Sequence, residues 1–276
     1  MSGALGSWVD GVAGAAVPAD DRGLQYGDGV FETILVRNGI ARFLEAHRAR
    51  LLRGLRRLGI PFEAQAELDA EIAAAAARAP ALAMLKIIVT RGSAARGYAP
   101  AGEIRARRVV SLWAAPPLAG ALLGQGAALD VASLRLPEFS ALAGIKHLNR
   151  LENVLAAREI AAGAHFEALM LDAGEKVVSG ISCNVFVVKA GEILTPPVDR
   201  VGVAGVMRQI VLREAPRLGI GAREQQLTLP DVLRADEMFI TNARLGVVPV
   251  QRVREHVFGM TLIAKRLRNA IEALDA

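Results

Sequence analysis

The chain has little cysteine, few aromatic residues and no long apolar run. Cys183 is its one cysteine, so no intrachain disulfide can form, which fits a reducing compartment. No apolar run reaches the roughly 18 residues that would predict a membrane span. Met1 to Asp10 has neither a basic start nor a sustained apolar stretch, so we expect no signal peptide. A cytoplasmic protein without a membrane partner is expected.

Several motifs that define common enzyme classes are also missing. The chain contains no G-x-G-x-x-G and no G-x-x-x-x-G-K-[ST] phosphate loop, which argues against the nucleotide enzymes of those classes. Its four histidines show no metal-ligand spacing, and we expect no metal site. Ser182 lies in G-I-S-C-N instead of a G-x-S-x-G elbow, and Cys183 lacks the motif of a thiol nucleophile.

Positive charge is in excess, but it does not predict a nucleic-acid partner. The formal net charge is +5 and the isoelectric point is about 9.9. The basic residues are mostly arginines scattered among acidic ones, and the densest group lies in a helical pattern with few aromatic residues nearby. This group comprises Arg48, Arg50, Arg53, Arg56 and Arg57. An anionic small substrate explains part of the charge equally well.

Hydrophobic periodicity predicts mixed helices and strands in both halves of the chain. Residues 29–36 read as a strand, and Asn38-Gly39 after them is a strong hairpin signal. A helical leucine stripe follows over 45–58 and ends at Gly59 and Pro61. Further strands are expected at 40–44, 84–90, 108–114, 128–134, 168–171, 176–178, 183–188, 192–194 and 237–241, and further helices at 64–78, 149–162, 206–218 and 259–274.

The pattern is interrupted between residues 116 and 126 by two prolines and three glycines. We therefore predict two α+β domains. Residues 1–116 would form a small N-terminal domain, 117–126 a linker, and 127–276 a larger C-terminal domain that carries Lys146. No internal repeat is present.

Lys146 is the first candidate for chemistry. It lies in IKHLNRLEN, after the turn at Gly144 and before a helix. A lysine that forms a Schiff base must be held in place and partly desolvated, and a position beside the apolar Ile145 meets both needs. A surface lysine at a loop end is the ordinary alternative. Lys86, inside an apolar strand, is the one serious rival among the other lysines.

Three further features are suited to an anion. Glycines at 202 and 205 precede the helix that begins at Val206, and such a helix start offers backbone N–H groups to a phosphate. Thr241 ends an apolar strand with a hydroxyl, and Arg50 carries a guanidinium that matches phosphate geometry. Each feature has an ordinary alternative. The glycines would form a plain turn, Thr241 would lie in a turn at the strand end, and Arg50 would lie on a solvated helix face.

A loop after the strand at 84–90 carries a fourth feature. Its sequence is R-G-S-A-A-R-G-Y, with Arg96 and Tyr98 near its end. These side chains are suited to a substrate carboxylate, although an ordinary surface loop has a similar composition.

Taken together, these segments resemble the fold-type IV pyridoxal-phosphate enzymes, which include branched-chain aminotransferases, D-amino-acid aminotransferases and aminodeoxychorismate lyases. The resemblance extends from DRGLQYGDGVFET, which begins at Asp21, to FITNARLGVVPV, which ends at Val250. It implies the two-domain D-amino-acid aminotransferase-like fold, pyridoxal 5'-phosphate as cofactor, and a homodimer in which a partner loop closes each site.

The resemblance also assigns residues. Lys146 matches the lysine that binds the cofactor covalently, and Arg50 in AHRARL matches an arginine that holds the cofactor phosphate. Val206 and Met207 match the helix start whose N–H groups bind that phosphate, and Thr241 matches the hydroxyl that completes the site. Arg96 and Tyr98 are assigned to the binding of a substrate carboxylate. The alternative is that both side chains serve the site of the neighbouring subunit in the dimer.

Within the group, KHLNRLE around Lys146 and R-G-x-x-x-R-G-Y before residue 99 are most similar to aminodeoxychorismate lyases. The implied reaction converts 4-amino-4-deoxychorismate to 4-aminobenzoate and pyruvate in folate biosynthesis. The family commonly has a glutamate five residues before the asparagine matched by Asn184, and Ser179 stands there. A hydroxyl can hydrogen-bond the cofactor ring nitrogen but cannot keep it charged. The alternatives are a D-amino-acid or branched-chain aminotransferase, a non-catalytic binding protein on the same scaffold, and a basic nucleic-acid-binding module.

Overall fold

The computed structural model describes residues 3–100, 102–138, 141–161, 163, 165–259 and 261–275. The chain divides into two compact units. Unit 1 comprises Met1–Pro117 and Ile145–Asn149, and unit 2 comprises Leu118–Gly144 and Arg150–Ala276. No helix in the described part of the chain is long and apolar enough to cross a membrane.

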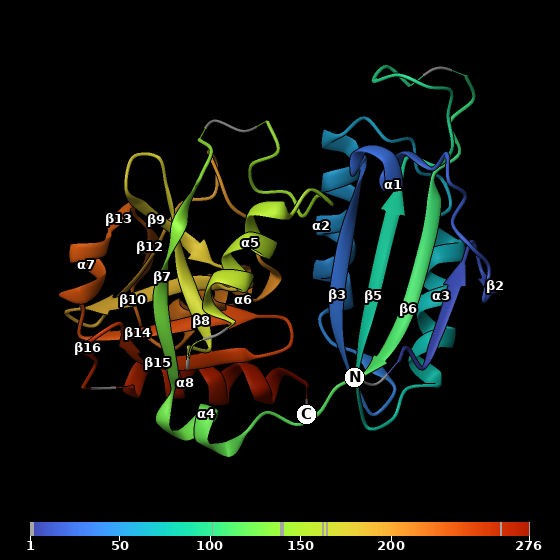
Figure 1. Ribbon diagram of the computed structural model, residues 1–276. Helices are drawn as coiled ribbons and strands as arrows, with labels where there is room; N and C mark the ends of the chain where they lie inside the picture. The colour runs from blue at the N-terminus through green and yellow to red at the C-terminus, as the bar shows by residue number, and fades with distance from the viewer. Residues whose placement is uncertain are drawn as a thin grey trace. The chain divides into compact units, whose positions relative to one another are not determined.

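Unit 1 is built on one antiparallel sheet of six strands in the order β2-β1-β6-β5-β3-β4 (Figure 1). The Asn38-Gly39 turn joins β3 to β4, as the hairpin signal predicts. The strands are β1 (Gly6–Val9), β2 (Val12–Ala13), β3 (Gly29–Arg37), β4 (Ile40–Ala41), β5 (Leu82–Thr90) and β6 (Arg107–Ala114).

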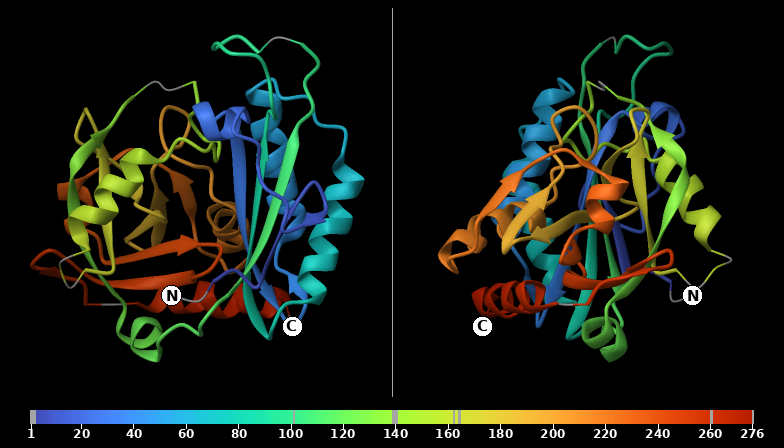
Figure 2. Two further views of the ribbon diagram at one scale, coloured as in Figure 1. Left: turned by 45° about the vertical axis from the view of Figure 1, so that its right-hand side comes forward. Right: turned by 90° about the vertical axis from the view of Figure 1, so that its left-hand side faces the viewer.

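Two helices cover one face of this sheet. Leu51 and Leu55 of α2 (Leu44–Arg57) and Ile72 of α3 (Gln65–Ala77) pack on alternate residues of β3, β5 and β6. Figure 2 shows both helices on the same side of the strands. The short helix α1 (Arg22–Tyr26) begins at Asp21, whose side chain accepts the N–H of Gly23. Because side chains alternate along a strand, the residues between the packed ones lie on the other face.

Unit 2 contains a mixed ten-stranded sheet in the order β12-β11-β10-β14-β15-β7-β8-β9-β13, with β16 paired to β15. The strands are β7 (Ala127–Leu136), β8 (Glu167–Asp172), β9 (Lys176–Gly180), β10 (Asn184–Lys189), β11 (Glu192–Thr195), β12 (Ala222–Glu224), β13 (Leu227–Thr228), β14 (Glu237–Asn242), β15 (Gly246–Val253) and β16 (His256–Val257). The helices are α4 (Gly120–Gln125), α5 (Leu151–Ile160), α6 (Val206–Arg217), α7 (Leu229–Leu233) and α8 (Leu262–Glu272), with a 3-10 turn at Ala273–Asp275.

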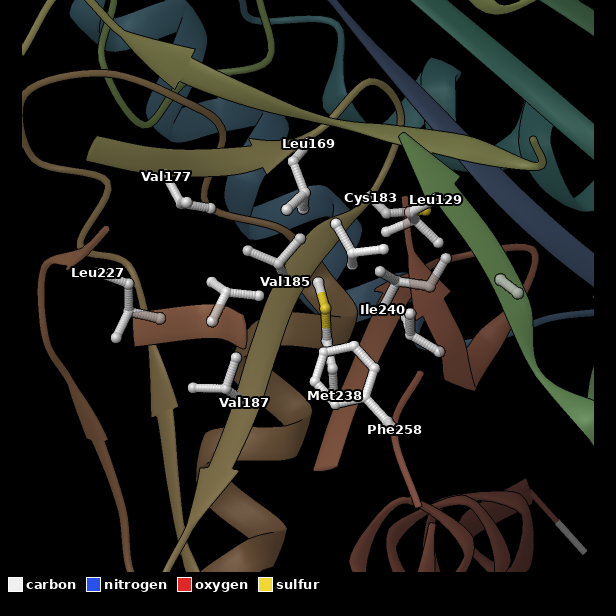
Figure 3. Close-up of a cluster of buried hydrophobic side chains, with 14 of the residues drawn as sticks. Leu129, Leu169, Val177, Cys183, Val185, Val187, Leu227, Met238, Ile240 and Phe258 are labelled. Atoms are coloured by element: carbon white, nitrogen blue, oxygen red, sulfur yellow. The ribbon is translucent and has the colours of Figure 1, made fainter. Parts of the chain in front are cut away.

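The main core of unit 2 lies on one side of β10 and β14. Val185, Met238 and Ile240 are directed into the same cluster as Leu169 (Figure 3). The intervening residues point the other way, where the rings of Phe186 and Phe239 stack with centroids 4.8 Å apart. Asn184 and Thr241 are register partners at the ends of these strands, and their spacing from Phe186 and Phe239 places them on that second side.

Three of the differences from the expectations concern the linker, Lys146 and β15. The segment expected as a linker contains α4, because Leu122 and Leu123 pack against the core of unit 2. Lys146, expected in the C-terminal domain, lies in a five-residue segment that groups with unit 1, because the backbone of that segment pairs with β3. Strand β15 was not expected, because Pro249 interrupts its strand pattern.

Candidate functional site

Lys146 is held in place by backbone pairing with the start of β3. Phe31 N donates to Lys146 O over 2.9 Å, and Leu148 N donates to Gly29 O over 3.0 Å. The Lys146 side chain reaches the Phe31 ring, with Nζ 4.2 Å from the ring centroid. An ammonium over an aromatic face gains about 0.5–2 kcal/mol, depending on its desolvation. Lys146 is half-buried, and the two backbone hydrogen bonds fix the position of its main chain.

Lys86, the rival lysine, contacts the same ring. Its Nζ lies 5.5 Å from the Phe31 centroid. Lys86 is the exposed residue of β5, on the face opposite to α2 and α3, and its strand neighbours are Thr33 and Ser111. Two lysines therefore lie beside one aromatic ring in unit 1.

Arg50 is buried on α2 and binds Glu32, which in turn binds His47, and the sequence patterns indicated neither of these two residues. The Glu32 carboxylate accepts hydrogen bonds from Arg50 Nε over 2.8 Å and from Arg50 Nη2 over 2.5 Å. His47 Nδ1 lies 2.7 Å from Glu32 Oε2. Glu32 is 1% exposed, on the side of β3 that carries Val30 and Ile34. The sequence signal that could have indicated this cluster is Glu32 itself, a charged residue at a core-facing position of a strand.

The protonation states of this cluster follow from its surroundings. Burial raises the pKa of Glu32, but the Arg50 charge and the hydrogen bonds from Arg50 and His47 outweigh it and lower that pKa. Burial lowers the pKa of His47, and the charges of Arg50 and Lys146 lower it further against the opposing effect of Glu32. Glu32 is therefore ionised and His47 neutral near pH 7.

The start of α6 in unit 2 has the features of an anion site. Gly205 is the N-cap, and no side chain caps the helix. Asn184 Nδ2 donates to Val203 O over 2.9 Å, and a methyl group on Gly205 would overlap Asn184 Oδ1. A glycine is therefore required where the backbone passes Asn184. The first N–H groups of a helix have no acceptor within the helix, and they favour negative charge.

Thr241 supplies the second observation at this place. It is 1% exposed, and its Oγ1 is buried without a hydrogen-bond partner among the described residues. It is the register partner of Asn184, which lies against Gly205. An unsatisfied buried hydroxyl is costly unless a ligand completes its bonding. A phosphate oxygen would do so, and the residues present therefore fit the phosphate group of pyridoxal phosphate.

Ser179 lies at the end of β9, half-buried, where its Oγ donates to Gly180 O over 2.8 Å. The turn after β9 donates to the buried carboxylate of Glu167, the first residue of β8, which the sequence patterns did not indicate. Glu167 accepts from Ile181 N at 2.7 Å and from Ser182 Oγ at 2.8 Å. Burial and Glu167 raise the pKa of the Cys183 thiol well above its ordinary value. Cys183 is therefore a poor nucleophile.

The loop with Arg96 and Tyr98 has a fixed backbone and exposed side chains. Arg22, itself 3% exposed, donates to Gly97 O over 2.8 Å and to Tyr98 O over 2.7 Å. Tyr98 is 88% exposed and Arg96 is also exposed. Their side chains are accessible to a ligand or to another chain.

The predicted residues are distributed over the two units. Lys146, Arg50, Arg96 and Tyr98 belong to unit 1. Ser179, Val206, Met207 and Thr241 belong to unit 2. Among the described residues, no group of three or more His, Cys, Asp or Glu side chains is arranged to hold a metal ion.

A family model described as amino-transferase class IV matches residues 29–253. The chain belongs to this family. The class IV relatives include the aminodeoxychorismate lyase of Vibrio harveyi, which is 37% identical over 89% of this chain and 90% of that protein. The family resemblance and the fold class expected from the sequence are confirmed.

Solved structures extend the comparison within class IV. The 4-amino-4-deoxychorismate lyase of Pseudomonas aeruginosa matches with a TM-score of 0.92 and 42% identity, over 97% of this chain and 98% of that one. A T.th. branched-chain amino acid aminotransferase, solved with pyridoxamine 5'-phosphate, matches with a TM-score of 0.86 and 25% identity. That match covers 99% of this chain and 94% of the aminotransferase.

Proposed function

We propose that this class IV protein is a pyridoxal-phosphate-dependent lyase that converts 4-amino-4-deoxychorismate to 4-aminobenzoate and pyruvate, a step of folate biosynthesis. The observation that carries the proposal is the 42% identity to the Pseudomonas aeruginosa lyase over nearly the full length of both chains. The lysine beside Phe31 and the anion site at α6 support it independently, because a phosphorylated cofactor that binds amines requires both kinds of group.

We assign the covalent attachment of the cofactor to Lys146 and the binding of its phosphate to Arg50, Thr241 and the N–H groups of Val206 and Met207. Only Ile145 separates Lys146 from Gly144 in the chain, and Gly144 N donates to Gly202 O over 2.9 Å, shortly before α6. This connectivity supports a role for both groups at one cofactor. When bound, the cofactor supplies an electron sink for the carbon that bears the substrate nitrogen.

Lys146 Nζ would carry the protons of the reaction. As a neutral amine it would take the proton from the ring carbon that bears the nitrogen. The carbon–oxygen bond to the enolpyruvyl group then breaks, and the ring becomes aromatic. The resulting ammonium would return a proton to the methylene carbon of enolpyruvate, which gives pyruvate. Phe31 holds the charged form of Lys146 in place during this step.

The remaining assignments concern specificity and assembly. Ser179 would hydrogen-bond the ring nitrogen, and Arg96 and Tyr98 would bind a substrate carboxylate in the same or the neighbouring subunit. We also propose a cytoplasmic homodimer. Light scattering coupled to size-exclusion chromatography should then give twice the 29.2 kDa of one chain, and a monomer would contradict the assembly.

An aminotransferase acting on D-amino or branched-chain acids is the second candidate, supported by the family description and by the likeness to the T.th. aminotransferase. Ser179 argues against it, because amino transfer depends on a charged ring nitrogen more than an elimination that forms an aromatic product. Pyruvate release from 4-amino-4-deoxychorismate, compared with amino transfer to 2-oxo acids, decides between the two candidates. Amino transfer without pyruvate release would reject the lyase.

Lys146→Ala should lower pyruvate release by at least about a thousandfold, since one residue acts as attachment point, base and acid. Lys189→Ala, at an exposed lysine at the end of β10, is the matched control and should retain the rate. The wild-type protein with pyridoxal phosphate should show a visible absorption band that borohydride removes. No band would reject every function that depends on this cofactor.

A further inference from the structure

Glu32 is a buried charge at a position where the strand pattern calls for an apolar residue. Its neighbours on the same face of β3, Val30 and Ile34, belong to the core that α2 and α3 cover. Burying a carboxylate is unfavourable unless its oxygens are well paired. The partners of Glu32 should therefore explain why it stands there.

Those partners lie one turn apart on α2. Arg50 Nε donates to Oε1 and Arg50 Nη2 donates to Oε2, so the carboxylate is bound by two parallel bonds of one planar guanidinium. His47 Nδ1 is the second donor to Oε2, at 2.7 Å. Since an ionised carboxylate only accepts hydrogen bonds, the neutral His47 ring must carry its proton on Nδ1. The Glu32 carboxylate therefore fixes the orientation of the Arg50 guanidinium along the edge formed by Nε and Nη2.

Charge alone does not account for this arrangement. A carboxylate next to Arg50 cancels the positive charge that would attract a phosphate, so a site selected for charge would not contain Glu32. Orientation accounts for it, because a long arginine side chain loses rotamer freedom when it binds a ligand unless folding has already fixed it.

We propose that Glu32 and His47 are positioning residues, which fix the Arg50 guanidinium for the phosphate of the cofactor. This role rests on the proposed function, in which Arg50 binds that phosphate. His47 acts through Glu32 without contact to the reacting atoms, and its variants should alter phosphate-dependent affinity more than the chemistry of turnover.

The test compares pyridoxal phosphate with pyridoxal, which lacks the phosphate. Dissociation constants are measured with the apoprotein by titration of the visible band. His47→Leu, which removes the donor, should weaken pyridoxal phosphate binding about tenfold, the effect of losing one hydrogen bond to a charged group. His47→Asn, which can place an amide N–H where Nδ1 lies, should restore affinity to within about twofold, by the same reasoning. Pyridoxal should bind all of these variants as it binds the wild type.

A double-mutant cycle separates positioning from a general effect on folding. In an Arg50→Met background, His47→Leu should cause no further loss of affinity, because the group that it positions is gone. An equal loss with and without Arg50, or an equal loss for pyridoxal, would overturn the proposal. Thermal unfolding of each apoprotein checks folding. His47→Gln, whose amide lies farther from Glu32, replaces His47→Leu if the latter does not fold.

Glu32→Gln discriminates orientation from charge. It removes the negative charge and breaks one of the paired bonds. If Glu32 acts by orienting Arg50, pyridoxal phosphate should bind more weakly. If Glu32 acts only through its charge, pyridoxal phosphate should bind more tightly. Tighter binding would overturn the proposal. Failure of the wild-type protein to bind pyridoxal phosphate at all would instead reject the proposed function, so the two failures are distinguishable.

Discussion

At the scale of single residues, Thr241 links stability and ligand binding in opposite directions. Its Oγ1 is buried without a partner among the described residues, at a cost of about 1–3 kcal/mol. Thr241→Val keeps the shape and removes the hydroxyl. We expect the free energy of unfolding of the apoprotein to rise by about 1 kcal/mol, and the affinity for pyridoxal phosphate to fall about tenfold. Denaturant unfolding and cofactor titration measure the two quantities.

Thr241→Ser is the matched control, because it keeps the hydroxyl and removes only the methyl group. It should retain most of the cofactor affinity and lose some stability from the cavity. If Thr241→Val bound the cofactor as tightly as the wild type, the hydroxyl would not be a phosphate ligand.

His47 and Glu32 also determine how stability depends on pH. The folded-state pKa of His47 lies below its ordinary 6.5, so the unfolded chain takes up a proton first as the pH falls. Stability should therefore begin to fall near pH 6.5 and continue to fall until the folded-state pKa is passed. The pKa of Glu32 is also lowered, so its contribution is present above pH 4.5 and is lost as pH falls through its folded-state pKa.

The free energy of unfolding, measured from pH 8 to pH 4, checks this. His47→Asn, which does not titrate, should flatten the decrease that begins near pH 6.5 and leave the decrease below pH 4.5 in place. An unchanged profile in His47→Asn would mean that another group causes the first decrease.

Ser179 is the residue at which the reaction type can be tested. Ser179→Glu would restore a carboxylate where the family commonly has one, and would stabilise a protonated ring nitrogen. We expect amino transfer to 2-oxo acids to rise at least severalfold relative to pyruvate release, because only amino transfer depends strongly on the charged ring. The ratio of the two rates is the measurement, with Ser179→Gln as the uncharged control. No change in the ratio would contradict the role of Ser179.

The sequence allowed only some of these residues to be predicted. Lys146 and Thr241 lie in local motifs, so their neighbours in the chain were enough to single them out, although their roles stay predictions. Glu32 and His47 belong to different elements and meet only when α2 packs on β3. A local sequence pattern does not contain that contact. Only Glu32, a charged residue on an otherwise apolar strand face, indicated it.

At the scale of elements, the anion site depends on a close approach between α6 and β10. A methyl group at Gly205 would overlap Asn184 Oδ1, and Asn184 cannot move without losing its bond to Val203 O. Gly205→Ala should lower the free energy of unfolding by about 2 kcal/mol through this overlap. It should also weaken pyridoxal phosphate binding, because the start of α6 must shift.

Gly124→Ala in α4 is the control, because nothing lies within 4 Å of its added methyl group. It should leave cofactor binding unchanged and raise stability by up to about 1 kcal/mol. The double variant Asn184→Ala, Gly205→Ala should recover part of the lost stability, since the overlapping atom is removed. If Gly205→Ala has no effect on either quantity, the approach is not tight.

Helices and strands were predicted best where the hydrophobic periodicity and the turn residues at the ends of the element agree. The Asn38-Gly39 turn and the leucine stripe predicted β3 and α2 nearly to the residue. The strand expected at 40–44 is only β4, Ile40–Ala41, because α2 already begins at Leu44. Strand β1 was not predicted, because its stability comes from pairing with β6 about one hundred residues later.

At the scale of the whole molecule, the chain enters unit 1 twice. Ile145–Asn149 pairs with the start of β3, while the residues on both sides of it belong to unit 2. The composition break near residue 117 agrees with the first change of unit but gives no sign of this return. Five residues are too few for a periodic pattern, and their placement depends on backbone hydrogen bonds formed in the folded state.

The net charge of +5 leads to a prediction for the molecule as a whole. The proposed substrate carries two carboxylates, so the field of the protein should raise its rate of encounter at low salt. We expect kcat/KM for pyruvate release to fall severalfold between about 20 and 300 mM salt, as the Debye length shortens from roughly 20 to 6 Å, while kcat changes little. Arg96→Gln should lower kcat/KM and reduce its dependence on salt, since one of the proposed attracting charges is lost. Potassium chloride and sodium chloride should give the same curve, which separates screening from specific ion binding. A kcat/KM that is independent of ionic strength would show that the positive charge does not contribute to substrate capture.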